Sequence, residues 1–292
     1  MCVGIGAGLE IWYAGIPNMD RSRLLHVRCA DFEERFFRHI EYPFQWKRHT
    51  DPLESEKELC SLLDRGLPVL LQTDIYFLPY FNSEVHFEGH VITVWGYDEK
   101  KKVFFVTDTE RKDLLEVPFD KMRRARFWKG VYLDIQGNIF APEKLYIPDN
   151  IEKTIRRAIK TNSRTLMDYS SEVKGICALK KWRDEISEWE HFKDWQWTAR
   201  FFYQVIEKRG TGGCGFRLMY AEFLKEAEEY IPEIASLGLA KRMFEVSFAW
   251  RELAIALKNA SKEKKADFSE THDKLLKVEK LETAYHKEAL SL

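Results

Sequence analysis

The sequence lacks the features that mark three common classes of protein. No apolar run approaches the roughly 20 residues that a transmembrane helix needs, so a membrane protein is not expected. The 46 basic and 47 acidic residues leave a formal charge of −1, and bulk charge therefore gives no reason to expect nucleic acid as a partner. No basic region precedes the first apolar stretch, which makes that stretch a poor secretory signal.

Cysteine is scarce and scattered. The chain has five cysteines, an odd number, and no two of them form a CxxC pair. They are Cys2, Cys29, Cys60, Cys177 and Cys214. This pattern argues against a disulfide framework and against a structural zinc site. It favours a reducing, cytoplasmic compartment.

The chain is rich in apolar residues, and their pattern differs between its first and second halves. Hydrophobic residues make up 45% of the 292 residues and aromatic residues 14%, enough for one large domain or two of ordinary size. Up to Pro142, short β-branched and aromatic runs alternate with short helical patterns, whereas nearly everything after Asp149 has helical periodicity. The sequence therefore predicts a mixed domain over residues 1–142 and a helical domain over residues 149–292.

The first half carries the clearest local signals. Residues 51–66 have helical spacing, with Gly66 placed just past the helix end. Leu67–Phe77 is predicted to be a strand buried on both faces, because it is nearly continuous in apolar residues. Residues 90–98, 102–109 and 113–119 are predicted to form an antiparallel meander, with GYDEKKK as its first turn.

A histidine and an aspartate occupy the two ends of the predicted hairpin. His90 begins one strand, and Asp108 ends the next, 18 residues later. In an antiparallel hairpin the start of one strand lies beside the end of the next, so the two side chains are expected to meet. The carboxylate would then accept the proton of His90 Nδ1 and orient a general base. The alternative is a pair of polar residues that end strands in solvent.

Further polar and aromatic residues stand near this hairpin. Asp74, Tyr76 and Tyr80 lie at the end of the predicted strand and in its loop, either to contact a ligand or as satisfied polar groups at a strand end. His86 precedes His90 by four residues, the spacing of a helical metal pair. Gly89 and the β-rich run argue against a helix there, and no third ligand is apparent. No metal site is therefore expected.

Two glycine-rich segments have open interpretations. GIGAGLE lacks the order of a nucleotide-binding loop and is predicted to be a tight turn, with Glu10 beyond it in the lining of a cleft. RGTGGCGFR supplies Arg209, Thr211 and Arg217, which could present an anion site at a helix start. The other interpretation of RGTGGCGFR is a corner between helices that needs glycine for close packing.

Several of these motifs resemble a known family. GHVITVWGYDEKKKVFFVTDT resembles the His–Asp hairpin of papain-like cysteine enzymes, including the double-glycine leader peptidases. Together with the LPY segment and RGTGGCGFRLMYAEFLKEA, it looks like butirosin biosynthesis protein H. The resemblance implies an α+β fold, in which a papain-like (cysteine-peptidase-like) domain of mixed α and antiparallel β structure precedes an all-α helical domain.

The family also implies a reaction. The resemblance implies an acyltransferase of antibiotic biosynthesis, which would move an acyl or aminoacyl group from an acyl carrier protein to a small-molecule amine. His90 would be the base and Asp108 its orienter, with no cofactor besides the phosphopantetheine on the carrier, whose phosphate is one anion for the RGTGGCGFR segment. The residues expected to bind substrate are Asp74, Tyr76, Tyr80, His86, Glu10, Arg209, Thr211 and Arg217.

The resemblance leaves the nucleophile open. The family's cysteine is expected upstream of the glycine segment at which this chain starts, so the first domain is interpreted as truncated at its N-terminus. Cys214 is a weaker candidate, since it belongs to the other predicted domain. Two rival functions follow: a cysteine hydrolase or peptidase on the same scaffold, and a catalytically inactive binding protein.

Overall fold

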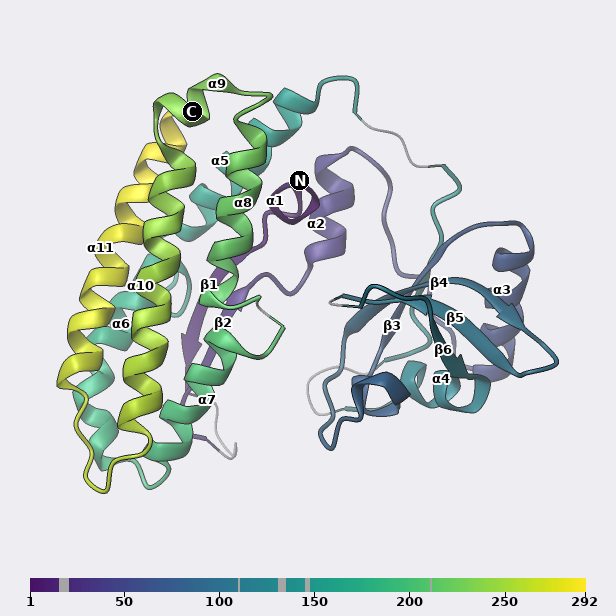
Figure 1. Cartoon of the computed structure of the whole chain (residues 1–292), viewed down its shortest axis with the longest axis horizontal. Helices are drawn as coiled ribbons and strands as arrows, with labels where there is room; N and C mark the ends of the chain where they lie inside the picture. Colours follow the sequence, from purple (N-terminus) through teal and green to yellow (C-terminus); the bar gives the residue numbers. More distant parts are fainter. Residues whose placement is uncertain (16–20, 110, 131–134, 145–147, 211) are drawn as a thin grey trace. The chain divides into compact units, whose positions relative to one another are not determined.

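The structure is a computed structural model that describes residues 1–292 except 16–20, 110, 131–134, 145–147 and 211 (Figure 1). The chain forms two compact units. Unit 1 comprises Met1–Pro43 and Ile147–Leu292, and unit 2 comprises Phe44–Tyr146. The predicted domains of 1–142 and 149–292 differ from these units, because the first 43 residues pack with the helices of the second half. A helical C-terminal region and antiparallel sheets make this a mixed α/β protein.

Unit 1 is a helical assembly around a two-stranded hairpin. Its elements are α1 (Cys2–Ile5), β1 (Leu9–Ala14), β2 (Leu24–Arg28), α2 (Phe32–His39), α5 (Ile151–Leu166), α6 (Gly175–Glu185), η3 (Ile186–His191), α7 (Trp195–Glu207), η4 (Cys214–Phe216), α8 (Arg217–Ala227), α9 (Pro232–Ser236), α10 (Leu239–Ala260) and α11 (Ser269–Ser291). Figure 1 shows α8, α10 and α11 running alongside one another. No helix in the part of the chain that the structure describes is both long and apolar enough to span a bilayer.

The β1–β2 hairpin lies inside the core of unit 1. Leu9, Ile11 and Tyr13 are fully buried, and the residues between them are half-buried, as expected of a strand with one core face. Tyr13 stacks on Trp182 of α6, and its hydroxyl donates a hydrogen bond to Glu185 at 2.8 Å. These contacts explain why the first residues of the chain belong to the helical unit.

The glycines of GIGAGLE serve this packing. A Cβ atom on Gly4 would lie 1.9 Å from the ring of Phe223, and one on Gly8 would lie 2.3 Å from the ring of Phe216. Any side chain at these positions would therefore collide with a buried aromatic ring. The segment lets backbone approach helices closely, which is the interpretation that the sequence favours over a nucleotide-binding loop.

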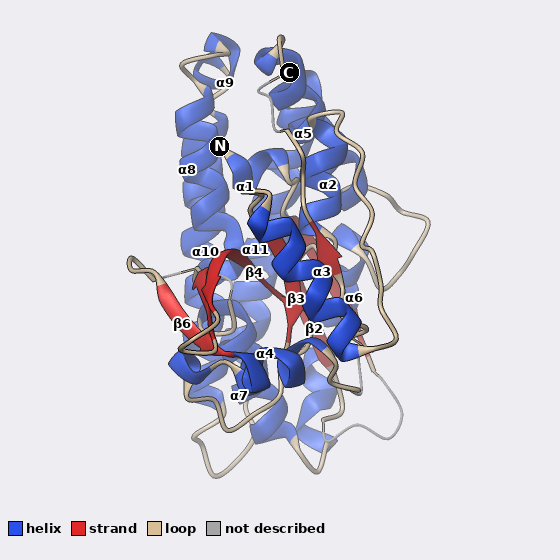
Figure 2. Ribbon diagram, turned by 90° about the vertical axis from the view of Figure 1, so that its right-hand side faces the viewer, coloured by secondary structure: helices blue, strands red, loops and turns tan. Residues whose placement is uncertain are grey.

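In its described residues, unit 2 contains a five-stranded antiparallel sheet and two α-helices. Its elements are α3 (Pro52–Asp64), β3 (Val69–Thr73), η1 (Ile75–Phe77), η2 (Pro79–Phe81), β4 (His90–Asp98), β5 (Val103–Thr107), β6 (Leu115–Pro118), α4 (Phe119–Arg126) and β7 (Ile139–Phe140). The strand order is β6-β5-β4-β3-β7. Figure 2 labels β6, β4 and β3 of this sheet. The predicted meander is confirmed, since β4, β5 and β6 are consecutive neighbours.

The prediction of a doubly buried strand over Leu67–Phe77 is wrong. β3 is shorter and alternates between buried and half-buried residues, so only one face is fully covered. That face packs with α3 and α4 in one core cluster. The strand ends where Asp74 accepts a hydrogen bond from the Tyr76 amide, which starts the turn η1 instead of another ladder position.

Helix α3 provides a direct stability test. The Asp51 carboxylate accepts hydrogen bonds from the amides of Leu53 and Glu54, each at 2.8 Å, and Pro52 occupies the first helical position. Asp51→Ala should lower the free energy of unfolding by about 1 kcal/mol, because these helix-end amides lose their acceptor. Asp51→Asn keeps an acceptor and should cost less. Urea unfolding of both variants measures this, and an unchanged stability of Asp51→Ala would show that the cap contributes nothing.

Candidate functional site

The predicted catalytic pair stands at one end of the sheet of unit 2. β4 begins at His90, which pairs with Thr73 at the end of β3. β5 runs antiparallel to β4 and ends at Thr107, so Asp108 follows it at the same edge. The turn of β4–β5 lies at the far end of both strands. This topology brings residues 18 positions apart in sequence into contact.

His90 and Asp108 form a close hydrogen-bonded pair. His90 Nε2 lies 2.8 Å from both carboxylate oxygens of Asp108. The Asp108 side chain is fully buried, and that of His90 is 16% exposed. The distance agrees with the geometry expected from the hairpin, but the nitrogen differs from the expected Nδ1. The ring reaches Asp108 with its distal nitrogen, so Nδ1 is the nitrogen left for a reacting group.

Two more donors hold the Asp108 carboxylate. The Tyr80 hydroxyl donates to Asp108 Oδ2 at 2.6 Å, and the Thr109 amide donates to Oδ1 at 2.6 Å. Burial by itself would raise the pKa of Asp108, but the hydrogen bond and charge of His90, with these donors, bring the pKa below its ordinary value. Burial and the same carboxylate raise the pKa of Tyr80. Asp108 is therefore ionised at neutral pH, and Tyr80 is a neutral donor that positions it.

No thiol in unit 2 is set up as a nucleophile. Cys60, on α3, is the one cysteine in residues 44–146. Burial and nearby carboxylates raise its pKa to about 11, so it is protonated at pH 7. Cys214, in unit 1, is buried and has a pKa raised to about 11. A reactive thiol needs the opposite shift, so neither residue has the character of a nucleophile.

A second histidine–carboxylate pair stands in the same unit. His86 Nδ1 lies 2.5 Å from Asp74 Oδ2, and the Asp74 side chain is fully buried. The His86 ring stacks between Trp128, at 3.9 Å between centroids, and Tyr76, at 4.2 Å. Three of the predicted substrate-binding residues are thus brought together. No motif in the sequence pointed to Trp128, which lies 42 positions after His86.

The two histidines do not form a metal pair. Each is bonded to its own buried carboxylate, His86 to Asp74 and His90 to Asp108. Within the described ranges, no group of three His, Cys, Asp or Glu side chains could hold a metal ion. The helical spacing of the two histidines is therefore coincidental.

The predicted anion site at RGTGGCGFR is wrong for Arg217. Its side chain is fully buried and forms an ion pair with Glu282 at 2.7 Å. The Cys214 amide of the same turn already donates to the Glu207 carboxylate at 3.1 Å. Arg209 bonds Gln204 and covers a ring of α7, and Thr211 lies outside the described residues. The segment is a packed corner between α7 and α8, which is the other interpretation of its glycines.

Glu10 and the predicted catalytic pair belong to different units. Glu10 lies on β1 in unit 1, whereas His90 and Asp108 lie in unit 2. Its backbone carbonyl accepts hydrogen bonds from Arg217, at 3.3 Å. Its contacts here are part of the hairpin's packing on the helices.

The Arg217–Glu282 pair is the centre of a buried cluster that the sequence did not reveal. Glu282 Oε1 also accepts a bond from the Trp250 indole at 2.7 Å, and Oε2 lies 3.1 Å from His286 Nε2. His286 Nδ1 lies 3.1 Å from the Ser163 hydroxyl. Arg217 and its partners Glu282 and His286 are all fully buried. The serine, histidine and glutamate resemble a catalytic triad in order, but no substrate could reach them.

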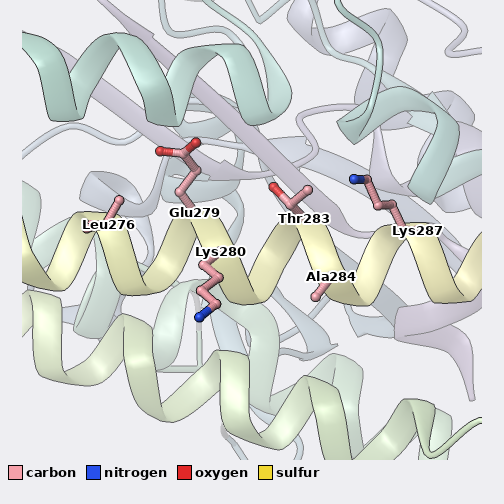
Figure 3. A pocket seen from close by; sticks show the side chains of 6 residues that line it. All are labelled: Leu276, Glu279, Lys280, Thr283, Ala284 and Lys287. Atoms are coloured by element: carbon pink, nitrogen blue, oxygen red, sulfur yellow. The ribbon is translucent and has the colours of Figure 1, made fainter.

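A shallow groove of about 350 Å³ lies on unit 1, along α11 (Figure 3). The residues that line it are Leu276, Glu279, Lys280, Thr283, Ala284 and Lys287. All six come from one helix, and Glu279 is already bonded to Arg183 of α6. The groove brings no catalytic pair together, and the candidate site is therefore the sheet end of unit 2.

Two family models match the chain. Residues 1–109 match the family described as Butirosin biosynthesis protein H, N-terminal, and residues 120–289 match the family described as Domain of unknown function (DUF4872). No curated protein matches the chain. The first match includes both His90 and Asp108, and the second begins within unit 2 and includes Trp128. The stack of His86 on Trp128 therefore joins the two matched regions.

Proposed function

The chain belongs to the DUF4872 family and carries a butirosin biosynthesis protein H N-terminal region, and from this we propose that it transfers acyl groups to amines. The donor in this proposal is an acyl or aminoacyl thioester on an acyl carrier protein, and the acceptor is a small-molecule amine. Both a carrier thioester and a free thiol suit the reducing, cytoplasmic compartment expected from the cysteine pattern.

The pair formed by His90 and Asp108 is the observation that carries the proposal. The buried Asp108 carboxylate fixes the ring through Nε2 and would stabilise its protonated form, while Nδ1 stays available for a thiol proton. We propose that this end of the antiparallel sheet corresponds to a papain-like site. Cys60 is not the thiol of this proposal, since it is half-buried and its raised pKa keeps it neutral.

The proposed reaction has two steps. In the first, the thiol gives its proton to His90 Nδ1, its sulfur bonds to the thioester carbon, and the carrier thiolate leaves with that proton. In the second, the acceptor nitrogen bonds to the same carbon, the carbon–sulfur bond to the protein breaks, and one amine proton passes through His90 Nδ1 to the departing thiolate. A hydrolase or peptidase would use water as the acceptor. A binding protein would carry out neither step, and the neutral Cys60 thiol favours it as the second candidate.

The test uses the protein with an acyl thioester of N-acetylcysteamine, which imitates the end of phosphopantetheine, and a primary alkylamine. We expect an acyl adduct by intact-protein mass spectrometry and amide product by chromatography. Cys60→Ser is the matched control and should keep full activity. Free acid in place of amide would favour the hydrolase. Tight binding of the thioester or amine without turnover would favour the binding protein.

A further inference from the structure

Unit 2 holds a second imidazole, whose ring contacts a carboxylate at one edge and an aromatic ring on each face. We propose that His86, held by Asp74, takes a proton from the acceptor amine, while His90 serves the thiol. This inference rests on the proposed acyl transfer and assigns the acceptor side of the same site. It is carried by geometry: one ring nitrogen is bonded to a buried carboxylate, both ring faces are covered, and the other nitrogen is left for a ligand.

The Asp74 carboxylate is positioned independently of His86. Its Oδ1 atom accepts hydrogen bonds from the backbone amides of Tyr76 and Phe87, each at 3.0 Å. Its Oδ2 atom faces His86 Nδ1 at 2.5 Å. Since an ionised carboxylate can only accept, Nδ1 carries the proton, and the lone pair of the neutral ring is on Nε2.

The two stacked rings restrict His86 to one orientation. The Trp128 ring lies parallel to it within 1°, and the Tyr76 ring lies on its other face with a tilt of 23°. A ring covered on both faces presents only its edge. The side chain is still one-third exposed, so the edge that carries Nε2 is the part that a ligand can meet.

Both histidine pairs belong to the same end of the sheet. Asp74 directly follows Thr73, which is paired with His90, and the Thr73 hydroxyl donates to the His90 carbonyl at 2.9 Å. His86 lies on the segment that leads into β4. The two rings use opposite nitrogens to bind their carboxylates, so His90 offers Nδ1 and His86 offers Nε2.

Acyl transfer to an alkylamine has a role for a second base, because two protons must leave the acceptor nitrogen. At pH 7 an alkylamine with a pKa of about 10 is an ammonium ion without a lone pair. His86 Nε2 takes one proton, the electron pair of that N–H bond stays on the amine, and the imidazolium forms against Asp74. The nitrogen then bonds to the thioester carbon, the thiolate leaves, and the second amine proton passes to His90 Nδ1.

The experiment measures amide formation by the His86→Asn variant and the wild type with two different acceptors. Asparagine can place an N–H donor where Nδ1 was and so keep the bond to Asp74, but it has nothing at the position of Nε2. With a primary alkylamine at pH 7, amide formation should fall about 10²–10⁴-fold. With hydroxylamine, which is uncharged at neutral pH, the loss should be less than about tenfold. The alkylamine defect should shrink about tenfold per pH unit as the free amine becomes available.

Two further variants separate this role from a structural one. His86→Phe keeps the stack on Trp128 without a nitrogen and should show the same selective loss. His49→Asn is the matched control, because His49 also meets a carboxylate in unit 2, Glu58 at 3.0 Å, and should behave as wild type with both acceptors. Equal losses with both acceptors, or no loss, would overturn the assignment of His86. Failure of the wild type with both acceptors would overturn the proposed function itself.

Discussion

Replacing His90 with alanine is expected to abolish acyl transfer, with kcat/KM at least about 10⁴-fold below that of the wild type. Without the imidazole, the thiol has no base and the departing carrier thiolate has no proton donor. The loss should appear with both alkylamine and hydroxylamine acceptors, unlike the selective loss expected for His86. Single-turnover formation of the acyl adduct measures the first step directly.

Asp108→Asn should have a smaller effect in the same assay. The variant keeps a side chain of the same shape but removes the charge that orients His90 and stabilises its protonated form. We expect a decrease of about 10²–10⁴-fold. Asp98→Asn, at the other end of β4, is the control for a lost carboxylate on the same strand. Wild-type rates in both His90→Ala and Asp108→Asn would make this pair a structural feature only.

The second large effect is on stability and concerns the buried cluster in unit 1. Glu282→Ala should lower the free energy of unfolding by about 3–5 kcal/mol, because it leaves the Arg217 guanidinium buried without its anion. The double variant Arg217→Met and Glu282→Met removes both charges and should be less destabilised than Glu282→Ala. Urea unfolding of the three proteins measures this. A loss below about 1 kcal/mol in Glu282→Ala would show that the pair is not needed.

The same carboxylate predicts how stability responds to acid. Burial would raise the pKa of Glu282, but the charge of Arg217 and the bonds from His286 and Trp250 lower it from 4.5 to about 2. A depressed pKa stabilises the folded state above pH 4.5, and this contribution is lost as the pH falls towards 2. Its size is about 3 kcal/mol. Glu282→Gln should lack this part of the pH dependence.

Local patterns predicted the parts of the fold that depend on neighbouring residues. The β4–β5 hairpin follows from alternating residues around a polar turn, and its register alone brings His90 to Asp108. The end of α3 follows likewise, since Gly66 adopts a positive φ of 76° just beyond it. In each case the structure depends on residues a few positions apart, which a sequence displays directly.

The predictions that were wrong concern features that depend on residues far apart in the sequence. Arg217 looked available to an anion because its local sequence is rich in glycine, but its partner Glu282 lies 65 residues later. The placement of His86 depends on Trp128, from a different segment. The assignment of residues 1–43 to the helical unit depends on a core completed by helices after residue 147. No periodicity within a short window reports such distant partners.

Two backbone hydrogen bonds join the first and last parts of unit 2. The Lys47 amide donates to the Ile139 carbonyl and the Ile139 amide to that of Lys47, each at 3.0 Å. On a ribosome that adds about 5–20 residues per second, unit 2 can close upon itself while the later helices are still untranslated. The β1–β2 hairpin cannot bury Leu9 and Ile11 until those helices have been translated. Residues 1–43 are thus translated before unit 2 but complete their core only after it.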